Sequence, residues 1–362
     1  MPTVELTLPH HHYEIRIESG LLAQLGEAMR EVVPHDKAVL IVDREIEKSH
    51  GRSAARSLTA AGYDTHVFVF PGGEANKNLG SYKQLLDAML AMGIERKTPV
   101  VALGGGITGD VAGFVAATCL RGLPLVQVPT TLLAMVDASV GGKTGVNTEQ
   151  GKNLVGAFHQ PERVIVDVDT LRTLPDRELR CGLAECVKHG VIRDATLLQW
   201  IRDNLEGIRA LRPDVMTELV HRNVAIKADV VMQDEKESGV RAHLNFGHTF
   251  AHAIEATNKH SKLLHGEAVA IGMVAATTLA VELGRCRREL LDQLVELLER
   301  IGLPTGSSRL APTHALMHYM THDKKVAGGR VRLILPESAG RVVMADDVPS
   351  DAVETAWDAV RT

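Results

Sequence analysis

The sequence predicts an α/β amino-terminal domain with a mostly parallel sheet, followed by a mainly α-helical carboxy-terminal domain. Up to about Pro175, short β-branched runs alternate with segments whose apolar residues recur every three or four positions. This alternation is typical of parallel strands joined by crossover helices. Beyond Pro175, long amphipathic segments dominate the chain. We therefore expect one domain at residues 1–175 and a second at residues 176–362.

The strands and helices of the first domain follow from these two periodicities. Strands are predicted at Tyr13 to Ile17, Ala38 to Val42, His66 to Phe70, Pro99 to Leu103, Leu125 to Val128 and Arg163 to Val166. Helices are predicted at Leu21 to Val32 and Leu79 to Met92.

The second domain is predicted to be helical apart from one hairpin. Its helices are expected at Asp176 to His189, Pro213 to Met232, Phe246 to Thr257, Glu267 to Leu283 and Arg288 to Ile301. The hairpin is expected to pair Val331 to Leu335 with Arg341 to Met344, because a Pro- and Gly-containing turn separates the two runs.

Composition excludes several classes of protein. With 362 residues, 45% hydrophobic and 23% charged, the chain is long enough for two globular cores. A net charge of -5 gives no overall attraction to nucleic acid or to an anionic membrane. No apolar run approaches the roughly 18 residues of a membrane-spanning helix. The four cysteines lack CxxC spacing and no segment reads as a secretion signal, so a cytoplasmic location is expected.

Two loops at predicted strand ends are suited to a nucleotide. The run from Gly104 to Asp110, GGGITGD, satisfies G-x-G-x-x-G at a strand-to-helix junction. Such a loop lets backbone N–H groups and a helix N-terminus approach a pyrophosphate, although a tight turn gives the same pattern. The acidic strand end Asp43 precedes the glycines, which departs from the common dinucleotide arrangement. A second loop, Gly72 to Lys77, follows another strand, so three strand ends could form one crevice.

The segment between Pro129 and Asn153 combines small residues with polar ones. Two lysines among glycines suit a phosphate dianion, because ammonium groups supply charge-assisted hydrogen bonds where the backbone can come close. A solvated loop with incidental lysines is the alternative, and Arg121 is open to the same two interpretations. The polar residues of this segment are Thr130, Thr131, Asp137, Lys143, Lys152 and Asn153.

Three predicted helices of the second domain carry metal-binding side chains. His248 and His252 are four residues apart, hence on one helix face, a spacing that can chelate zinc. Thr249 stands where a metalloprotease would carry its glutamate, which argues against peptide hydrolysis. His265 opens another helix, and Glu185 shares a face of a third with Lys188 and His189. Spacing does not decide which of these bind metal, but together they could build a three-ligand site with an open position.

Six ordered blocks of the sequence resemble one known family. The blocks are GGGITGD, RGLPLVQVPTTLLAMVDASVGGKTGVN, GKNLVGAFHQP, GLAECVKHGVIRD, RAHLNFGHTFAHAIE and LLHGEAVAIGM. Together they resemble the 3-dehydroquinate synthase family of sugar phosphate cyclases, essentially from end to end. The resemblance implies that the chain converts 3-deoxy-D-arabino-heptulosonate 7-phosphate to 3-dehydroquinate and phosphate, the second step of the shikimate pathway. The resemblance also implies the steps of this conversion: transient oxidation by NAD, phosphate elimination, re-reduction, ring opening and an intramolecular aldol step.

The resemblance also implies a role for each matching residue. One zinc or cobalt ion would be held by Glu185, His248 and His265, so that His252 is not a ligand. NAD would contact Asp43, Gly72, Gly73, Glu74, Ala75, Asn76, Lys77, Gly106, Ile107, Thr108, Gly109, Asp110, Thr130, Thr131, Lys143, Lys152, Thr170, Leu171, Arg172 and Thr173. Substrate would be bound by Arg121, Asp137, Lys143, Asn153, Lys188, Lys227, Arg241, Asn245, His252 and Lys324. Catalytic roles would fall to Asp137, Lys143, Lys188, Asn245 and His252. The resemblance further implies a homodimer in which Arg121 would reach the phosphate pocket of the partner subunit.

Three other functions are weighed against this one. Another sugar phosphate cyclase would not need a carboxylate site, whereas Arg241, Lys227 and Asn245 favour an acid substrate. A metal-dependent polyol dehydrogenase would need no phosphate pocket, and Lys143, Lys152 and His252 argue against it. A non-catalytic NAD-binding module would be favoured by the loss of a chemical residue, but every expected one is present.

Overall fold

The computed structural model describes residues 2–257, 263–322, 332–346 and 348–361. The chain divides into two compact units. The first comprises Met1–Pro175 and Gly207–Met232, and the second comprises Asp176–Glu206 and Gln233–Thr362. In the described residues no helix combines the length and the apolar character that a membrane crossing requires.

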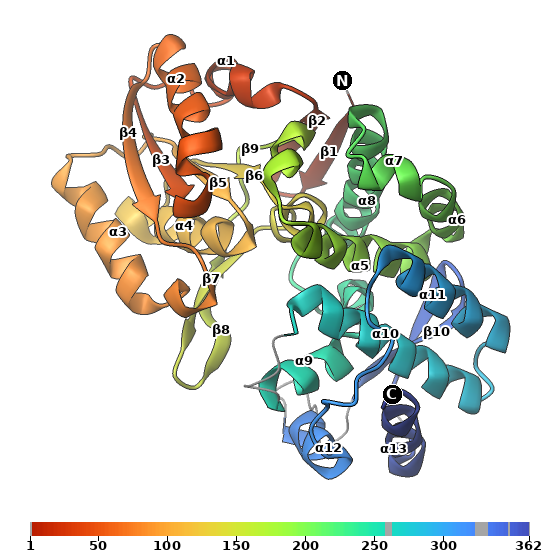
Figure 1. Ribbon diagram of the computed structural model, residues 1–362. Coiled ribbons are helices and arrows are strands. Elements are labelled where there is room, and N and C mark those ends of the chain that lie inside the picture. Colours follow the sequence, from red (N-terminus) through yellow and green to blue (C-terminus); the bar gives the residue numbers. More distant parts are fainter. Residues whose placement is uncertain (1, 258–262, 323–331, 347, 362) are drawn as a thin grey trace. The chain divides into compact units, whose positions relative to one another are not determined.

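The first unit is built on a seven-stranded sheet of order β1-β2-β9-β6-β5-β3-β4 (Figure 1). All neighbouring pairs are parallel except β1 with β2. The carboxyl ends of the parallel strands therefore lie along one edge of the sheet. The strands are β1 (Thr3–Leu8), β2 (His11–Glu18), β3 (Lys37–Asp43), β4 (Asp64–Phe70), β5 (Val100–Gly104), β6 (Leu125–Pro129) and β9 (Arg163–Asp167).

Helices cover both faces of this sheet, because successive residues of strands such as β3, β5 and β9 are apolar and present apolar side chains to both faces. In β3, Leu40 and Val42 belong to a core with α1 (Leu25–Arg30) and α2 (Arg52–Ala60). Val39 and Ile41, which point to the opposite face, belong to a core with α3 (Leu79–Ala91) and α4 (Gly106–Thr118). The predicted α/β organisation with a mostly parallel sheet is thus confirmed.

A separate antiparallel hairpin accompanies the sheet in the first unit. Strands β7 (Lys143–Thr148) and β8 (Gly151–Phe158) form it, and β7 packs against α4. These strands and β1 were not predicted. Glycines and polar residues interrupt the apolar pattern of β7 and β8, whereas β1 alternates Val4, Leu6 and Leu8 with polar residues and could have been recognised. Short 3₁₀ turns follow the ends of β4 and β9, namely η4 (Glu74–Asn76) and η7 (Val168–Thr173), and another, η5 (Cys119–Arg121), follows α4.

The second unit is mainly helical, as predicted (Figure 1). Its central helix is α10, which is buried along most of its length and packs against α5, α9, α11 and α13. The predicted hairpin is present as β10 (Leu333–Ser338) and β11 (Arg341–Ala345), while Val331 lies outside the described residues. The helices are α5 (Asp176–Arg193), α6 (Ala195–Asp203), α9 (His248–Thr257), α10 (His265–Glu282), α11 (Arg288–Ile301), α12 (Thr313–His322) and α13 (Ser350–Ala359).

One segment beyond residue 175 belongs to a different unit from the one predicted. Helix α8 (Pro213–Gln233) is present where a helix was expected, but residues 207–232 form part of the first unit. There the Lys227 ammonium donates hydrogen bonds to the backbone carbonyl and the carboxylate of Asp137. Apolar periodicity shows that one face of α8 is buried, but it does not show against which unit. Helix α7 (Leu205–Arg209) spans this boundary.

Candidate functional site

Two glycines bring the metal-binding candidates of the second unit together. Gly247 has a φ of +77°, and a Cβ there would lie 2.9 Å from the backbone nitrogen of Met273. A Cβ on Gly266 would lie 2.3 Å from the backbone oxygen of Cys181 on α5. Only glycine permits these approaches. As a result, α10 packs closely against both α9 and α5. His248 and His265, the first residues of α9 and α10, therefore lie beside α5.

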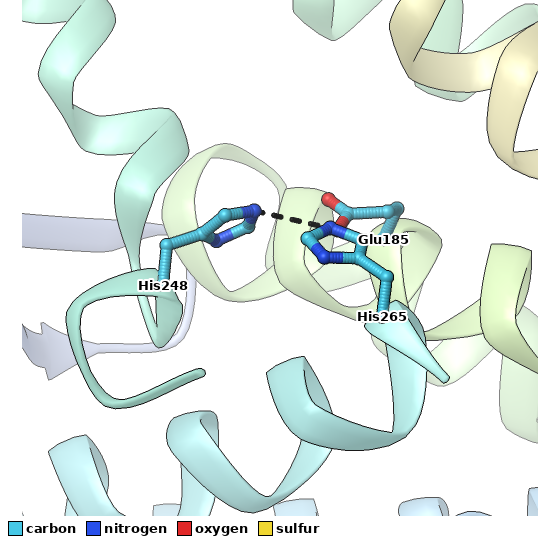
Figure 2. Close-up of side chains that lie close together, drawn as sticks. All are labelled: Glu185, His248 and His265. Carbon is cyan, nitrogen blue, oxygen red and sulfur yellow. Dashed lines mark ion pairs between the residues drawn. The ribbon is translucent and has the colours of Figure 1, made fainter. Parts of the chain in front are cut away.

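Glu185, His248 and His265 form a compact donor group. Each offers one ligand atom, and these atoms all lie within 4.8 Å of one another. Nε2 of His248 and Nε2 of His265 are each 3.6 Å from Oε1 of Glu185. Figure 2 shows the three side chains turned toward one another from three different helices.

The chemistry of this group fits a divalent cation. Two imidazole nitrogens and one carboxylate oxygen are a donor set that zinc accepts at catalytic sites, where a further position stays open. Glu185 is fully buried, and its Oε1 accepts no hydrogen bond from any described residue. Its other oxygen, Oε2, forms an ion pair with the Lys188 ammonium one turn along α5. A buried carboxylate oxygen without a hydrogen bond is suited to a cation.

The environment sets the protonation of the donors. Burial opposes ionisation of Glu185, but the Lys188 ammonium and the two histidines hold its pKa well below the usual value. Burial and the positive charge of Lys188 lower the pKa of His248 to about 3, so its imidazole is neutral near pH 7. Burial also opposes protonation of His265, but the carboxylates of Glu185 and Glu255 outweigh it and raise its pKa to about 10.

His252 lies next to this group without belonging to it. Its ring centroid is 5.7 Å from that of His248, as expected for residues four apart on α9. Within the described residues, the donor group contains His248 and His265 but not His252. Spacing along the sequence could not have distinguished the two histidines of α9.

Two of the predicted substrate residues of the second unit lie on the loop before α9. Arg241 and Asn245 both belong to η8 (Val240–Asn245), and Arg241 is only 2% exposed. Asn245 Nδ2 donates to Glu237 Oε1 at 2.7 Å. The Arg241 guanidinium donates to the backbone carbonyl of Glu235.

Asp234 organises this loop, although the sequence did not single it out. Its carboxylate accepts from the backbone nitrogens of Ser238 at 2.9 Å, Gly239 at 2.7 Å and Arg241 at 3.0 Å. Burial opposes its charge, but these hydrogen bonds prevail and lower the pKa of Asp234 to about 2. An aspartate just past a helix end and before several polar residues is the signal that could have identified it.

In the first unit, Asp43 lies at the edge where the strand ends meet. It is the last residue of β3, and its Oδ2 accepts from the Thr108 hydroxyl at 3.1 Å at the start of α4. Gly72, with a φ of +66°, passes so close that a Cβ would lie 2.7 Å from Asp43 Oδ2. Both predicted nucleotide loops therefore contact the same carboxylate.

Lys77 connects the second loop to α4 and to the hairpin. Its side chain is 5% exposed, and Nζ donates to Asp110 Oδ2 at 2.5 Å and to Asn153 Oδ1 at 2.6 Å. Glu74 accepts from Asn147 Nδ2 at 2.8 Å and lies 3.7 Å from Lys152 Nζ. Lys77 thus links Asp110, another predicted NAD residue, to Asn153, which is predicted to bind the phosphate.

The surroundings of the Asp110 carboxyl group shift its pKa upward. Burial raises its pKa above the ordinary value, and this effect exceeds the opposing influence of Lys77 and Lys227. The charge of Asp137 adds to the rise. The cationic neighbours of Asp110 therefore offset only part of the effect of burial on its pKa.

The remaining predicted NAD residues belong to two other strand ends. Thr130 follows β6 and donates its backbone N–H to Gly104 at 2.9 Å, and Thr131 Oγ1 accepts from Ala134 at 3.2 Å. Residues Thr170 to Thr173 lie in η7, where Thr173 Oγ1 lies 2.7 Å from Nε2 of His50. His50 was not predicted, and nothing in its sequence neighbourhood indicates the contact.

Two predicted residues, Lys143 and Arg121, are exposed. Lys143 begins β7, and Arg121 ends η5 with a φ of +66°. Lys324 lies outside the described residues.

Comparison with known proteins places this chain in a family. Residues 67–181 match the family described as 3-dehydroquinate synthase N-terminal, and residues 182–326 match 3-dehydroquinate synthase C-terminal. A 3-dehydroquinate synthase of Nostoc punctiforme is 46% identical over 352 residues, covering 97% of each chain.

Solved structures agree with this placement. A 2-epi-5-epi-valiolone synthase of Streptomyces hygroscopicus, with NAD+ and Zn2+ bound, has a TM-score of 0.90 at 27% identity, covering 98% of both chains. A 2-deoxy-scyllo-inosose synthase with carbaglucose-6-phosphate, NAD+ and Co2+ has a TM-score of 0.89 at 27% identity, covering 98% of this chain and 99% of that one. These cyclases are less similar in sequence than the curated synthase, so the comparisons support the principal interpretation over the alternatives. This chain belongs to the 3-dehydroquinate synthase family.

Proposed function

We propose that this chain converts 3-deoxy-D-arabino-heptulosonate 7-phosphate into 3-dehydroquinate and phosphate. It would act as a phosphate-eliminating lyase that needs NAD and one divalent metal ion, zinc or cobalt. The observation that carries the proposal is the buried donor group of Glu185, His248 and His265, in a chain 46% identical to a 3-dehydroquinate synthase.

The metal ion would be held by these three side chains. When bound, it supplies Lewis acidity toward a substrate oxygen. Lys188 is fixed one turn from Glu185 with its ammonium ion-paired to the carboxylate, so it can donate to a hydroxyl that approaches the same group. Arg241 presents a planar guanidinium, which suits the carboxylate of the substrate. Asn245 and His252 add further hydrogen-bonding groups on either side of His248 in the sequence.

NAD would be held by the strand-end loops of the first unit. When bound, it accepts a hydride from a secondary alcohol and returns it later in the cycle. Asp43 offers a carboxylate to ribose hydroxyls, and the N-terminus of α4 offers backbone N–H groups to a pyrophosphate. The contacts of Lys77 with Asp110 and Asn153 fix the second loop before the cofactor binds.

Asp137 and Lys227 form a further polar pair in the first unit. The pair joins the segment after β6 to α8 through two hydrogen bonds from the Lys227 ammonium. Its proposed role is to contact substrate hydroxyls. Lys143 and Asn153 are proposed to bind the phosphate.

Assembly and location are also proposals. We propose a homodimer in which Arg121 serves the partner subunit, and its exposure in the single chain supports this role. A cytoplasmic location is proposed as well, since the four cysteines are unpaired in the structure.

One assay tests the activity. Purified protein is given the heptulosonate phosphate with catalytic NAD and zinc, while inorganic phosphate and the absorbance of reduced nicotinamide are followed together. Stoichiometric phosphate release without lasting reduced nicotinamide is expected, because the hydride returns to the substrate. Treatment with a chelator should abolish phosphate release, and added zinc or cobalt should restore it.

A second substrate distinguishes the alternatives. A heptulose phosphate without a carboxylate should be turned over poorly, and Arg241→Met should remove the preference for the acid. Faster turnover of the carboxylate-free sugar would favour another cyclase. Accumulation of reduced nicotinamide without phosphate release would favour a dehydrogenase, and full activity after complete metal removal would contradict the proposed metal dependence.

A further inference from the structure

The imidazole of His265 lies between two carboxylates. Its Nε2 is 3.6 Å from Glu185 Oε1, on the side of the donor group. Its Nδ1 is 3.5 Å from Oε1 of Glu255, a residue that belongs to none of the roles assigned above. One ring nitrogen therefore faces the candidate metal position while the other faces an acid.

Glu255 reaches His265 from helix α9. His248, His252 and Glu255 occupy the first, fifth and eighth positions of α9, so they share one face of that helix. Helix α9 packs against α10, which begins at His265. Helix α9 thus carries both the donor His248 and Glu255, the acid that contacts the other histidine donor, His265.

The two histidines are held in the same way but by different acceptors. Nδ1 of His248 lies 3.2 Å from the backbone carbonyl of Phe246, and its Nε2 faces Glu185. A hydrogen bond on one ring nitrogen fixes the tautomer and leaves the other nitrogen as the donor to a metal. His248 has a neutral carbonyl in this position, whereas His265 has a carboxylate.

We propose that Glu255 is a positioning residue for the metal site, accepting the Nδ1 proton of His265 so that Nε2 is presented to the cation. The inference rests on the proposed donor group of Glu185, His248 and His265 and adds a residue to it. A carboxylate in this position orients the ring and increases the basicity of the coordinating nitrogen. It also adds a negative charge close to a cation.

Two substitutions separate orientation from charge. Glu255→Ala removes the acceptor and should weaken metal binding by about 10- to 100-fold, the range found when outer partners of metal ligands are lost. Glu255→Gln keeps a carbonyl acceptor at the same reach and should recover part of this loss. The expected order of metal affinity is wild type, then Gln, then Ala. Glu282→Gln, an exposed glutamate at the other end of α10, is the matched control.

The experiment measures metal binding directly. Metal-free protein is titrated with cobalt, whose visible absorption reports coordination geometry, and zinc affinity is measured by competition with a chelator. NAD affinity and the unfolding midpoint of the metal-free proteins serve as controls for folding. Wild type and Glu282→Gln should bind alike, while the Glu255 variants should bind more weakly with an altered cobalt spectrum.

The outcomes separate this inference from the proposed function. If wild type binds neither cobalt nor zinc, the donor group itself is wrong and Glu255 loses its role with it. If wild type binds metal and both Glu255 variants match it in affinity and spectrum, only the role of Glu255 is overturned. Should Glu255→Ala fail to fold, Glu255→Gln carries the comparison, because its size and shape are nearly those of glutamate.

Discussion

At the scale of single residues, the second unit stabilises a fully buried carboxylate by surrounding it with cationic and imidazole groups. Glu185 contacts Lys188, His248 and His265, and no one of these contacts is a surface ion pair. A buried charge is tolerated only when its partners stay in place. The histidines are therefore expected to matter for the fold around Glu185 as well as for the proposed cation.

Substituting one donor tests this arrangement. His248→Ala should reduce phosphate release to below about 1% of wild type, because the Lewis acid loses one of its ligands. NAD affinity should persist, since the predicted NAD residues lie in the first unit. Steady-state phosphate assays and NAD titration measure the two effects. His314→Ala, an exposed histidine on α12, is the control, and substantial turnover by His248→Ala would contradict the assignment.

In the first unit, Lys77 likewise provides the cationic partner of a partly buried carboxylate, that of Asp110. Lys77→Met should lower the free energy of unfolding by about 1–3 kcal/mol, because the partly buried Asp110 loses its cationic partner. NAD affinity should fall as well, because the second loop loses its connection to α4. Urea unfolding and NAD titration measure the two losses. In Lys77→Met with Asp110→Asn, stability should recover while NAD affinity does not.

The stability loss of Lys77→Met should depend on pH. Burial already raises the pKa of Asp110 above its unfolded value, so the folded state favours the protonated acid. Stability from such a group is present at low pH and declines as pH rises above the unfolded pKa. Loss of Lys77 raises the folded pKa further, so the deficit should be small near pH 4 and larger at pH 8. An equal deficit at both values would contradict this account of Asp110.

At the scale of elements, close helix packing positions the donors. Gly266→Ala would place a Cβ 2.3 Å from the Cys181 carbonyl, so α10 must move away from α5. We expect a stability loss of about 1–3 kcal/mol, typical of overpacking. Metal affinity should also fall, since His265 adjoins Gly266. Thermal unfolding and chelator competition measure these changes.

Gly80→Ala on α3 is the control for Gly266→Ala, because its Cβ would meet only Asn78 Oδ1 at 3.1 Å. Its metal affinity should equal that of wild type. Equal stability of Gly266→Ala and wild type would show that the contact between α5 and α10 relaxes without consequence.

The loop held by Asp234 is the second element that positions a functional side chain. Asp234→Asn removes the charge that organises the backbone before Arg241. The Michaelis constant for the heptulosonate phosphate should rise about 10-fold, the equivalent of weakening one charge-assisted hydrogen bond. The turnover number should change less. Steady-state kinetics measure both, with exposed Lys236→Gln as the control from the same loop.

Much of the fold could be predicted because strand burial is visible in the sequence. Runs such as Ala38 to Val42 are apolar on both faces, as buried parallel strands require. The hairpin of β7 and β8 was not predicted, because glycines and polar residues interrupt its few apolar ones and its packing against α4 is not visible in the sequence. Helix α10 begins at His265 rather than Glu267, since Glu267 accepts the backbone N–H of Leu264 and caps the helix.

The candidate site was predictable only in part. Histidine spacing identified α9 but left His248 and His252 equivalent, and the resemblance to a known family separated them. Asp234 was missed although its place just past the end of α8 is a recognisable signal, whereas the contact of Glu255 with His265 is not revealed by local spacing. His50 was missed for the same reason, since its partner Thr173 is distant in the sequence.

At the scale of the whole molecule, the cofactor residues are divided between the two units. All predicted NAD residues belong to the first unit, and the three metal donors belong to the second. The two sets share no side chain. Under the proposed function, each unit would therefore bind one cofactor with its own residues, and turnover would need both.

This division predicts that the two binding events are independent. Lys77→Met should lower NAD affinity while zinc affinity stays within about twofold of wild type, as expected for sites without shared partners. His248→Ala should lower zinc affinity while NAD affinity stays within about twofold of wild type. NAD titration and chelator competition on both variants provide the four measurements. If His248→Ala lost NAD affinity about as strongly as Lys77→Met, well beyond the roughly twofold expected of independent sites, the two units would have to act as one binding system.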